Sequence, residues 1–133
     1  MPGRQTVGDV IDQINRFIED FRAYRAQPML PGNFREAEMR ERAIKYTVQC
    51  LTEATSRLPE TEKAKAPDFP WQRLVDAGNV IRHDYDDIAI ALIDELDEKG
   101  HLVALQKAVA EMDRTSQAIR RDRRRRPTQT RGR

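Results

Sequence analysis

The chain has 133 residues, of which 35% are charged and 38% hydrophobic, and its formal net charge is +2. This length fits one domain with a modest core, and the low hydrophobic content suggests that a partner subunit covers some apolar surface. No apolar run approaches the ~20 residues of a membrane span, and the N-terminal residues lack a signal-peptide core. A single cysteine, Cys50, excludes an internal disulfide framework. We therefore expect a cytoplasmic protein that does not associate with membranes.

The net charge is unevenly distributed along the chain. Residues 114–133 contain nine arginines and one acid, Asp122, which gives +8 and leaves −6 for residues 1–113. We expect a folded helical domain over residues 1–113 and a disordered, basic tail over residues 114–133. Clustered arginines also bind phosphate backbones nonspecifically, so contact of the tail with RNA or with a partner is the alternative.

Two amphipathic helices are predicted in the first half of the chain. Between Thr6 and about Arg25, apolar residues recur every three or four positions, with Thr6 as the expected N-cap. The segment AQPMLPGN then ends the helix. Asn33 and Glu36 resemble a capping box that starts a second helix, which Pro59 ends. The apolar stripe of this second helix is expected to comprise Phe34, Ala37, Ile44, Val48, Leu51 and Leu58.

Three further helices are predicted after a polar connector, PETEKAKAPDFP. One begins at Trp71, directly after Pro70, and continues to about Ile81. The next begins after Asp86 or Asp87, either of which could cap it, and Gly100 separates it from the last helix. Its apolar positions are Ile88, Ala91, Leu92 and Leu96, and those of the last helix are Leu102, Leu105, Ala108, Val109 and Met112. The pattern predicts an all-α, up-and-down bundle of about five helices.

The stretch GNVIRHDY contains the residues best suited to chemistry. Arg82, His83, Asp84 and Tyr85 place a fixed cation, an imidazole, a carboxylate and a phenol in consecutive positions. Histidine exchanges protons near neutral pH, so His83 is the expected general base, and Arg82 is the expected phosphate-binding cation. On a helix Asn79 shares the face of His83, and Asn79 and Asp84 are the expected supporting residues.

Two histidines without a cysteine cluster do not form a zinc-binding pattern, and no metal or cofactor is expected.

The order of these motifs resembles the HepT-like proteins of the HEPN superfamily, from about Val7 to Met112. The resemblance rests on a helix ending in TEATSRLP, a proline-bounded loop, PW, GNVIRHDY and a closing LVALQKAV. Within these motifs, Glu53-Ala54 resembles a recurring Glu-Ala pair of the family. Trp71 resembles a recurring tryptophan, and His83-Asp84-Tyr85 resembles the His-x-Tyr motif.

The resemblance implies an HEPN-like helical bundle that forms a symmetric homodimer. It also implies a metal-independent endoribonuclease whose Arg-x4–6-His motif meets its symmetry mate across the dimer interface. HepT-like proteins are the toxins of toxin–antitoxin pairs, and their antitoxin is a small nucleotidyltransferase of the MNT type. The resemblance further implies that this partner silences the toxin by adding AMP to the tyrosine of His-x-Tyr, here Tyr85.

The sequence departs from the family at the motif arginine. This arginine would fall on Gly78, Ala77 or Asp76, but the only nearby guanidinium after Arg73 belongs to Arg82. One hypothesis is that the helix loosens at Ile81, which lets Arg82 replace the missing cation. The alternative is a catalytically silent HEPN subunit that binds a nucleotidyltransferase or nucleic acid as a scaffold.

Overall fold

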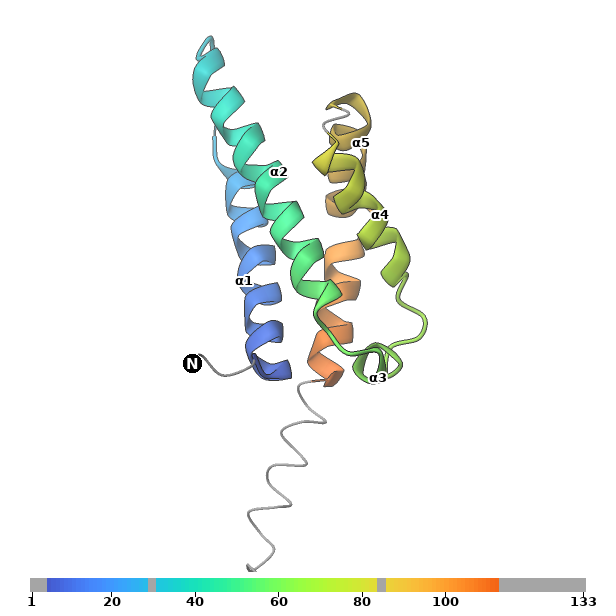
Figure 1. Ribbon diagram of the computed structural model, residues 1–133. Helices are drawn as coiled ribbons and strands as arrows, with labels where there is room; N and C mark the ends of the chain where they lie inside the picture. Colours follow the sequence, from blue (N-terminus) through green and yellow to red (C-terminus); the bar gives the residue numbers. More distant parts are fainter. Residues whose placement is uncertain (1–4, 29–30, 84–85, 113–133) are drawn as a thin grey trace, which may run out of the picture.

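Six helices and no strand form the part of the chain that the structure, a computed structural model, describes. This part comprises residues 5–28, 31–83 and 86–112, with residues 86–90 described by their backbone alone. The helices are α1 (Val7–Ala26), α2 (Phe34–Ser56), α3 (Glu60–Lys63), α4 (Trp71–Arg82), α5 (Asp86–Glu98) and a last helix over residues 101–112. The all-α prediction is confirmed, and α3 is a single turn inside the predicted connector (Figure 1).

Local capping signals start both long helices. The Thr6 hydroxyl accepts a hydrogen bond from the Asp9 amide at 3.0 Å, and the Asp9 carboxylate accepts one from the Thr6 amide. The Asn33 side chain accepts from the Glu36 amide at 3.0 Å and also donates to the Glu36 carboxylate. Both N-caps were predicted, because a side chain three positions from an unpaired amide needs no tertiary contact to satisfy it.

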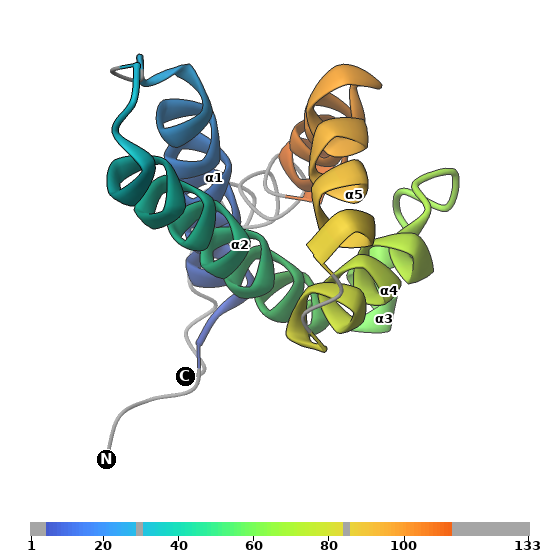
Figure 2. The ribbon, with the colours of Figure 1, turned by 90° about the horizontal axis from the view of Figure 1, so that it is seen from above.

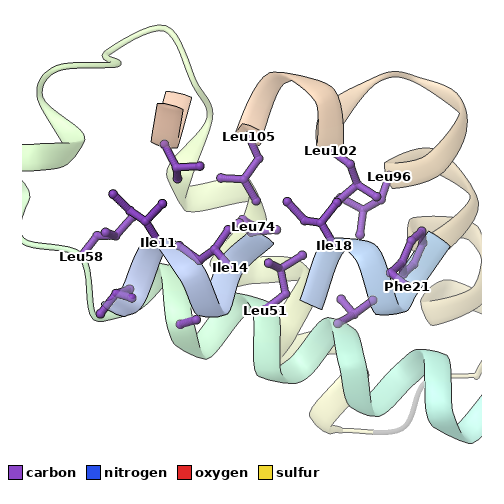
Figure 3. Close-up of a cluster of buried hydrophobic side chains, with 14 of the residues drawn as sticks. Ile11, Ile14, Ile18, Phe21, Leu51, Leu58, Leu74, Leu96, Leu102 and Leu105 are labelled. Carbon is purple, nitrogen blue, oxygen red and sulfur yellow. The ribbon is translucent and has the colours of Figure 1, made fainter. Parts of the chain in front are cut away.

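Antiparallel α1 and α2 form one side of the molecule, and α4, α5 and the last helix pack on the other (Figures 1 and 2). Their buried side chains meet in one core (Figure 3). In α1, the side chains of Ile14, Ile18 and Phe21 are completely buried. Every predicted apolar position of the last helix is buried. These are Leu102, Leu105, Ala108, Val109 and Met112.

The predicted stripe of α2 is wrong at its N-terminal end. Phe34 is 86% exposed, and Ala37 is exposed as well. Periodicity places both on the core side, but the first turns of α2 extend past the end of α1 and have no helix to pack against (Figure 1). In α5 the prediction also fails at Ala91, which is exposed, whereas Ile93 is buried.

The helical pair α2 and α4 approach closely because of Gly78. A Cβ atom added to Gly78 would lie 2.3 Å from the Thr52 hydroxyl oxygen, far inside van der Waals contact. Thr52 is buried, and its hydroxyl donates to the Gln49 carbonyl at 2.9 Å. This contact fixes the position of α4 on α2, and therefore the position of the residues that follow α4.

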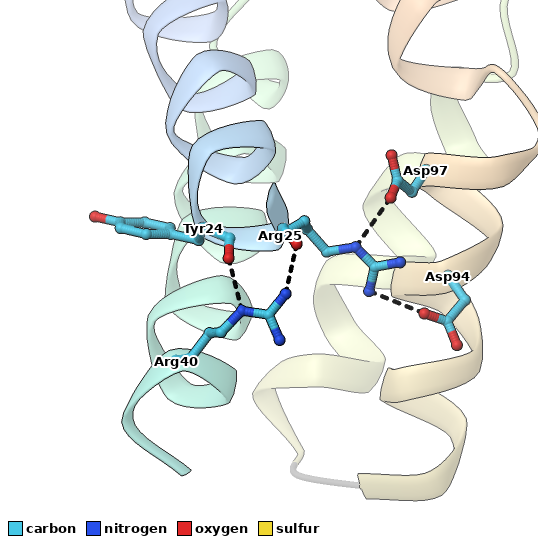
Figure 4. Close-up of polar contacts among 5 residues, drawn as sticks. All are labelled: Tyr24, Arg25, Arg40, Asp94 and Asp97. Atoms are coloured by element: carbon cyan, nitrogen blue, oxygen red, sulfur yellow. Dashed lines mark hydrogen bonds and ion pairs between the residues drawn. The ribbon is translucent and has the colours of Figure 1, made fainter. Parts of the chain in front are cut away.

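An arginine on α1 ties the first side of the molecule to α5 (Figure 4). Arg25 donates to Asp94 at 2.9 Å and to Asp97 at 3.0 Å. Partial burial lowers the pKa of Arg25, but its bonds to Asp94 and Asp97 outweigh this effect and raise the pKa overall. Arg40 of α2 completes the junction by donating to the carbonyls of Tyr24 and Arg25, which end α1.

Candidate functional site

The end of α4 presents the predicted catalytic residues to solvent. The helix begins after Pro70 and buries Leu74 and Ile81 against the core, which leaves its polar face outside. Arg82 is its last residue and His83 is its C-cap, and both side chains are exposed. A base and a cation at this position are accessible to a large substrate such as RNA.

The polar residues at this end contact one another through Asn79. The Arg82 guanidinium donates to the Asn79 side-chain oxygen at 3.2 Å. The backbone amide of His83 donates to the Asn79 carbonyl at 3.1 Å. Asn79 therefore orients the Arg82 guanidinium, and its carbonyl closes the last turn of α4 with the His83 amide. Asn79 was predicted as a supporting residue on the face of His83, and its side-chain oxygen accepts the bond from Arg82.

The predicted loosening of the helix at Ile81 does not occur. Residue 81 is helical and 4% exposed, and α4 continues regularly to Arg82. The chain leaves helical geometry only at His83, with φ −86° and ψ 3°. The departure lies in ψ of His83, which redirects the residues that follow it, whereas the His83 amide still makes a helical hydrogen bond to the Asn79 carbonyl. The Cα–Cβ bonds of Arg82 and His83 therefore point about 100° apart around the axis, as for consecutive residues within a helix.

No larger side chain fits at the position where the family arginine would stand closest to the histidine. Gly78 lies against Thr52, and Ala77 is 5% exposed and packed in the interior. Asp76 is exposed, but its carboxylate accepts from Gln72 at 2.9 Å. Among the described residues of α4 that follow Arg73, Arg82 is the single cation.

Asp84 and Tyr85, the other predicted site residues, lie outside the described residues. Glu53 of the Glu-Ala pair is exposed, whereas Ala54 is completely buried. Cys50 is half-buried, and a hydrogen bond between its side chain and Tyr46 raises the pKa of the tyrosine. These observations place Ala54 in the core and leave Glu53 on the outer face of α2.

A second group of polar side chains was not found by sequence reasoning. Arg73, Glu95 and His101 come from α4, α5 and the last helix and line one pocket. Each is unremarkable in its own segment, and only the packing of three helices brings them together. The sequence therefore contains no short motif that could have signalled them.

Within residues 5–28, 31–83 and 86–112, no group of three His, Cys, Asp or Glu side chains could hold a metal ion. No helix in those same ranges has the length and apolar character needed to cross a bilayer.

Comparison with known proteins identifies one family. The model of the family described as "Ribonuclease HepT-like" matches residues 9–112. These residues include α1 except its first two residues, α2 to α5, the last helix, Arg82 and His83. Neither a curated protein nor a solved structure matches the chain.

Proposed function

The chain belongs to the HepT-like ribonuclease family, and on this premise we propose that it is the ribonuclease toxin of a toxin–antitoxin pair. Its reaction is metal-independent cleavage of RNA by His83 and Arg82. The observation that carries the proposal is the exposed pair at the end of α4, an imidazole at the C-cap directly after a guanidinium held by Asn79.

The chemistry of RNA cleavage suits these two groups. His83 takes the proton of a ribose 2′-hydroxyl, and the 2′-oxygen attacks the adjacent phosphorus. The bond from phosphorus to the 5′-oxygen breaks, and that oxygen leaves as a hydroxyl after receiving a proton. Arg82 stabilises the negative charge of the pentacoordinate phosphorane through two N–H groups of its planar guanidinium. The products are a 2′,3′-cyclic phosphate and a 5′-hydroxyl.

A symmetric homodimer would complete this site. One imidazole accepts the 2′-proton, and a second acid must protonate the leaving 5′-oxygen. A two-fold axis beside the end of α4 would supply that second imidazole from His83 of the other protomer. The exposure of Arg82 and His83 at the end of α4 supports this arrangement, because both side chains are accessible on the surface of the described residues.

Regulation is proposed to act on the adjacent tyrosine. An MNT-type nucleotidyltransferase would neutralise the toxin by transferring AMP from ATP to the Tyr85 hydroxyl, with release of pyrophosphate. The added phosphate would place negative charge two and three residues from His83 and Arg82. It would compete with RNA for the Arg82 guanidinium.

A specific observation favours a second function, that of a catalytically silent subunit. The tight contact between Gly78 and Thr52 removes the position that an upstream arginine would need. If Arg82 does not bind the scissile phosphate, the same surface would only hold RNA or the nucleotidyltransferase.

Expression of the chain without its partner distinguishes the two functions. A toxin arrests growth, and His83→Ala abolishes the arrest while circular dichroism shows unchanged helicity. Coexpression with a cognate MNT-type nucleotidyltransferase should relieve the arrest and add one AMP at Tyr85, seen by intact-mass and peptide spectrometry. Arrest that persists in the His83→Ala variant would refute the nuclease function, and relief without an adduct would refute regulation through Tyr85.

A further inference from the structure

A pocket with apolar walls lies between α4, α5, the last helix and the loop before α4, away from Arg82 and His83. Its volume is about 160 Å³, and it is open to solvent on one side. Its apolar walls come from three separate segments. They are formed by Phe69, Leu74, Ala77, Leu92 and Leu96.

One side of the pocket is polar, and two fixed positive charges lie there beside a single carboxylate. The Glu95 carboxylate lies 3.8 Å from Arg73, 3.9 Å from Lys99 and 3.7 Å from His101. All three distances exceed hydrogen-bonding range, so these three side chains surround the carboxylate without occupying its acceptor positions. Arg73 and Lys99 are fixed cations with side chains 69% exposed, and one carboxylate cannot balance both.

The size and chemistry of the pocket define the ligand that it suits. Drug-sized ligands need about 300–1,000 Å³, so this smaller volume accommodates one flat ring system. Phe69 and the aliphatic walls provide surfaces on which such a ring can stack. Glu95 accepts N–H groups from the edge of the ring, and the cations at the mouth attract an anionic substituent.

We propose that the pocket binds a single nucleotide of unpaired RNA, with the base between Phe69 and Leu92 and its phosphate near Arg73 and Lys99. Guanine suits it best, because its Watson–Crick edge presents two adjacent N–H donors to the two oxygens of Glu95. This inference rests on the proposed function, since it gives that ribonuclease a second contact with its substrate.

The pocket and the reactive end of α4 are close enough for one RNA strand to contact both. Arg73 and His83 are separated by ten residues of one helix, or about 15 Å along its axis. A strand of a few nucleotides can extend from one to the other along the outer surface of α4. The pocket would then select which phosphodiester reaches His83, whereas the chemistry would remain at His83 and Arg82.

Binding can be measured without cleavage by using the full-length His83→Ala variant. GMP titrated into isotopically labelled protein should shift the amide signals of Arg73, Leu92 and Glu95 and saturate. Trp71, the sole tryptophan, packs against Phe69 with ring centroids 4.5 Å apart, so its fluorescence should change in the same titration. Ribose 5-phosphate, which lacks the base, should bind at least tenfold more weakly than GMP.

Two substitutions locate the site. Arg73→Glu, on an exposed side chain, should weaken GMP binding at least tenfold, and Leu92→Trp should block it by filling the pocket. Arg22→Glu changes an exposed arginine on α1 by the same charge and should leave binding unaltered. In the active protein, Arg73→Glu should raise KM for RNA with little change in kcat.

The result that would overturn the inference is separate from failure of the nuclease proposal. GMP binding that Arg73→Glu weakens would support the pocket even if the wild-type protein cleaves no RNA. Unmoved pocket amides at millimolar GMP, or equal binding of ribose 5-phosphate, would refute the nucleotide site. A dimer that Arg73→Glu dissociates would show instead that a second copy of the chain occupies the pocket.

Discussion

Gly78 determines how closely α4 approaches α2, and so where Arg82 and His83 lie. Gly78→Ala should raise helix propensity but force the new methyl against Thr52, where overpacking outweighs the gain. We expect a loss of about 1–2 kcal/mol in unfolding free energy, measured by urea denaturation. Gln72→Ala, at an exposed position of the same helix, serves as the control and should change stability by only a few tenths of a kcal/mol.

A double-mutant cycle identifies Thr52 as the cause. In a Thr52→Ala background the hydroxyl and methyl that crowd Gly78 are removed, so the further change Gly78→Ala should cost less than it does alone. An equal cost in both backgrounds would show that the two residues do not interact. The arginine that restores the family spacing, Gly78→Arg, is accordingly expected to destabilise the fold rather than raise activity.

Arg82 is predicted to act through the shape of its guanidinium as well as its charge. Arg82→Lys keeps the charge but loses the planar pair of N–H donors, so cleavage of RNA should fall strongly. The measurement is the initial rate with an RNA substrate, compared with Arg22→Lys as the control at an exposed position. A rate in Arg82→Lys equal to that of the wild type would contradict a bidentate phosphate contact.

At the scale of elements, the sequence predicted how both long helices begin, because those features depend on neighbouring residues. Thr6 and Asn33 were identified as N-caps because a cap is satisfied within one turn. Phe34 and Ala91 were placed wrongly because burial depends on where another helix ends, which periodicity does not contain. The same limit applies to the sites. Adjacent Arg82 and His83 could be predicted, whereas the pocket around Glu95 required three helices to meet.

The tie between α1 and α5 should stabilise the fold measurably. Arg25 is held by two carboxylates, and its side chain is 25% exposed, so solvent screens it only partly. Arg25→Gln should lower the free energy of unfolding by roughly 1–2 kcal/mol. Arg42 pairs with Glu38 on an open surface, where both side chains are more than half exposed. Arg42→Gln should therefore change the free energy of unfolding little. Equal losses of unfolding free energy in Arg25→Gln and Arg42→Gln would show that solvent screens the two arginines alike.

At the scale of the whole molecule, the negative charge lies in residues 1–113 and the positive charge in residues 114–133. Residues 1–113 carry −6 and repel RNA at long range, whereas residues 114–133 carry +8. Removal of residues 114–133 should weaken RNA binding most at low salt, because arginine–phosphate contacts release counterions. Fluorescence anisotropy with a labelled RNA between 50 and 200 mM salt measures this. An unchanged salt dependence would exclude the tail from RNA contact.

The proposed reaction also requires two protomers. Light scattering at micromolar protein concentration should give twice the 15.5 kDa mass of one chain, with and without added salt. A monomer under both conditions would contradict a site that needs His83 from each protomer.

The central claim is that His83 cleaves RNA, and purified protein freed of its partner tests it most directly. The wild-type chain, incubated with RNA in the presence of EDTA, should yield fragments that end in 2′,3′-cyclic phosphate and 5′-hydroxyl groups. The His83→Ala variant, with unchanged helicity and prepared in the same way, should yield none. Intact RNA with the wild-type protein, or equal cleavage by His83→Ala, would contradict the account.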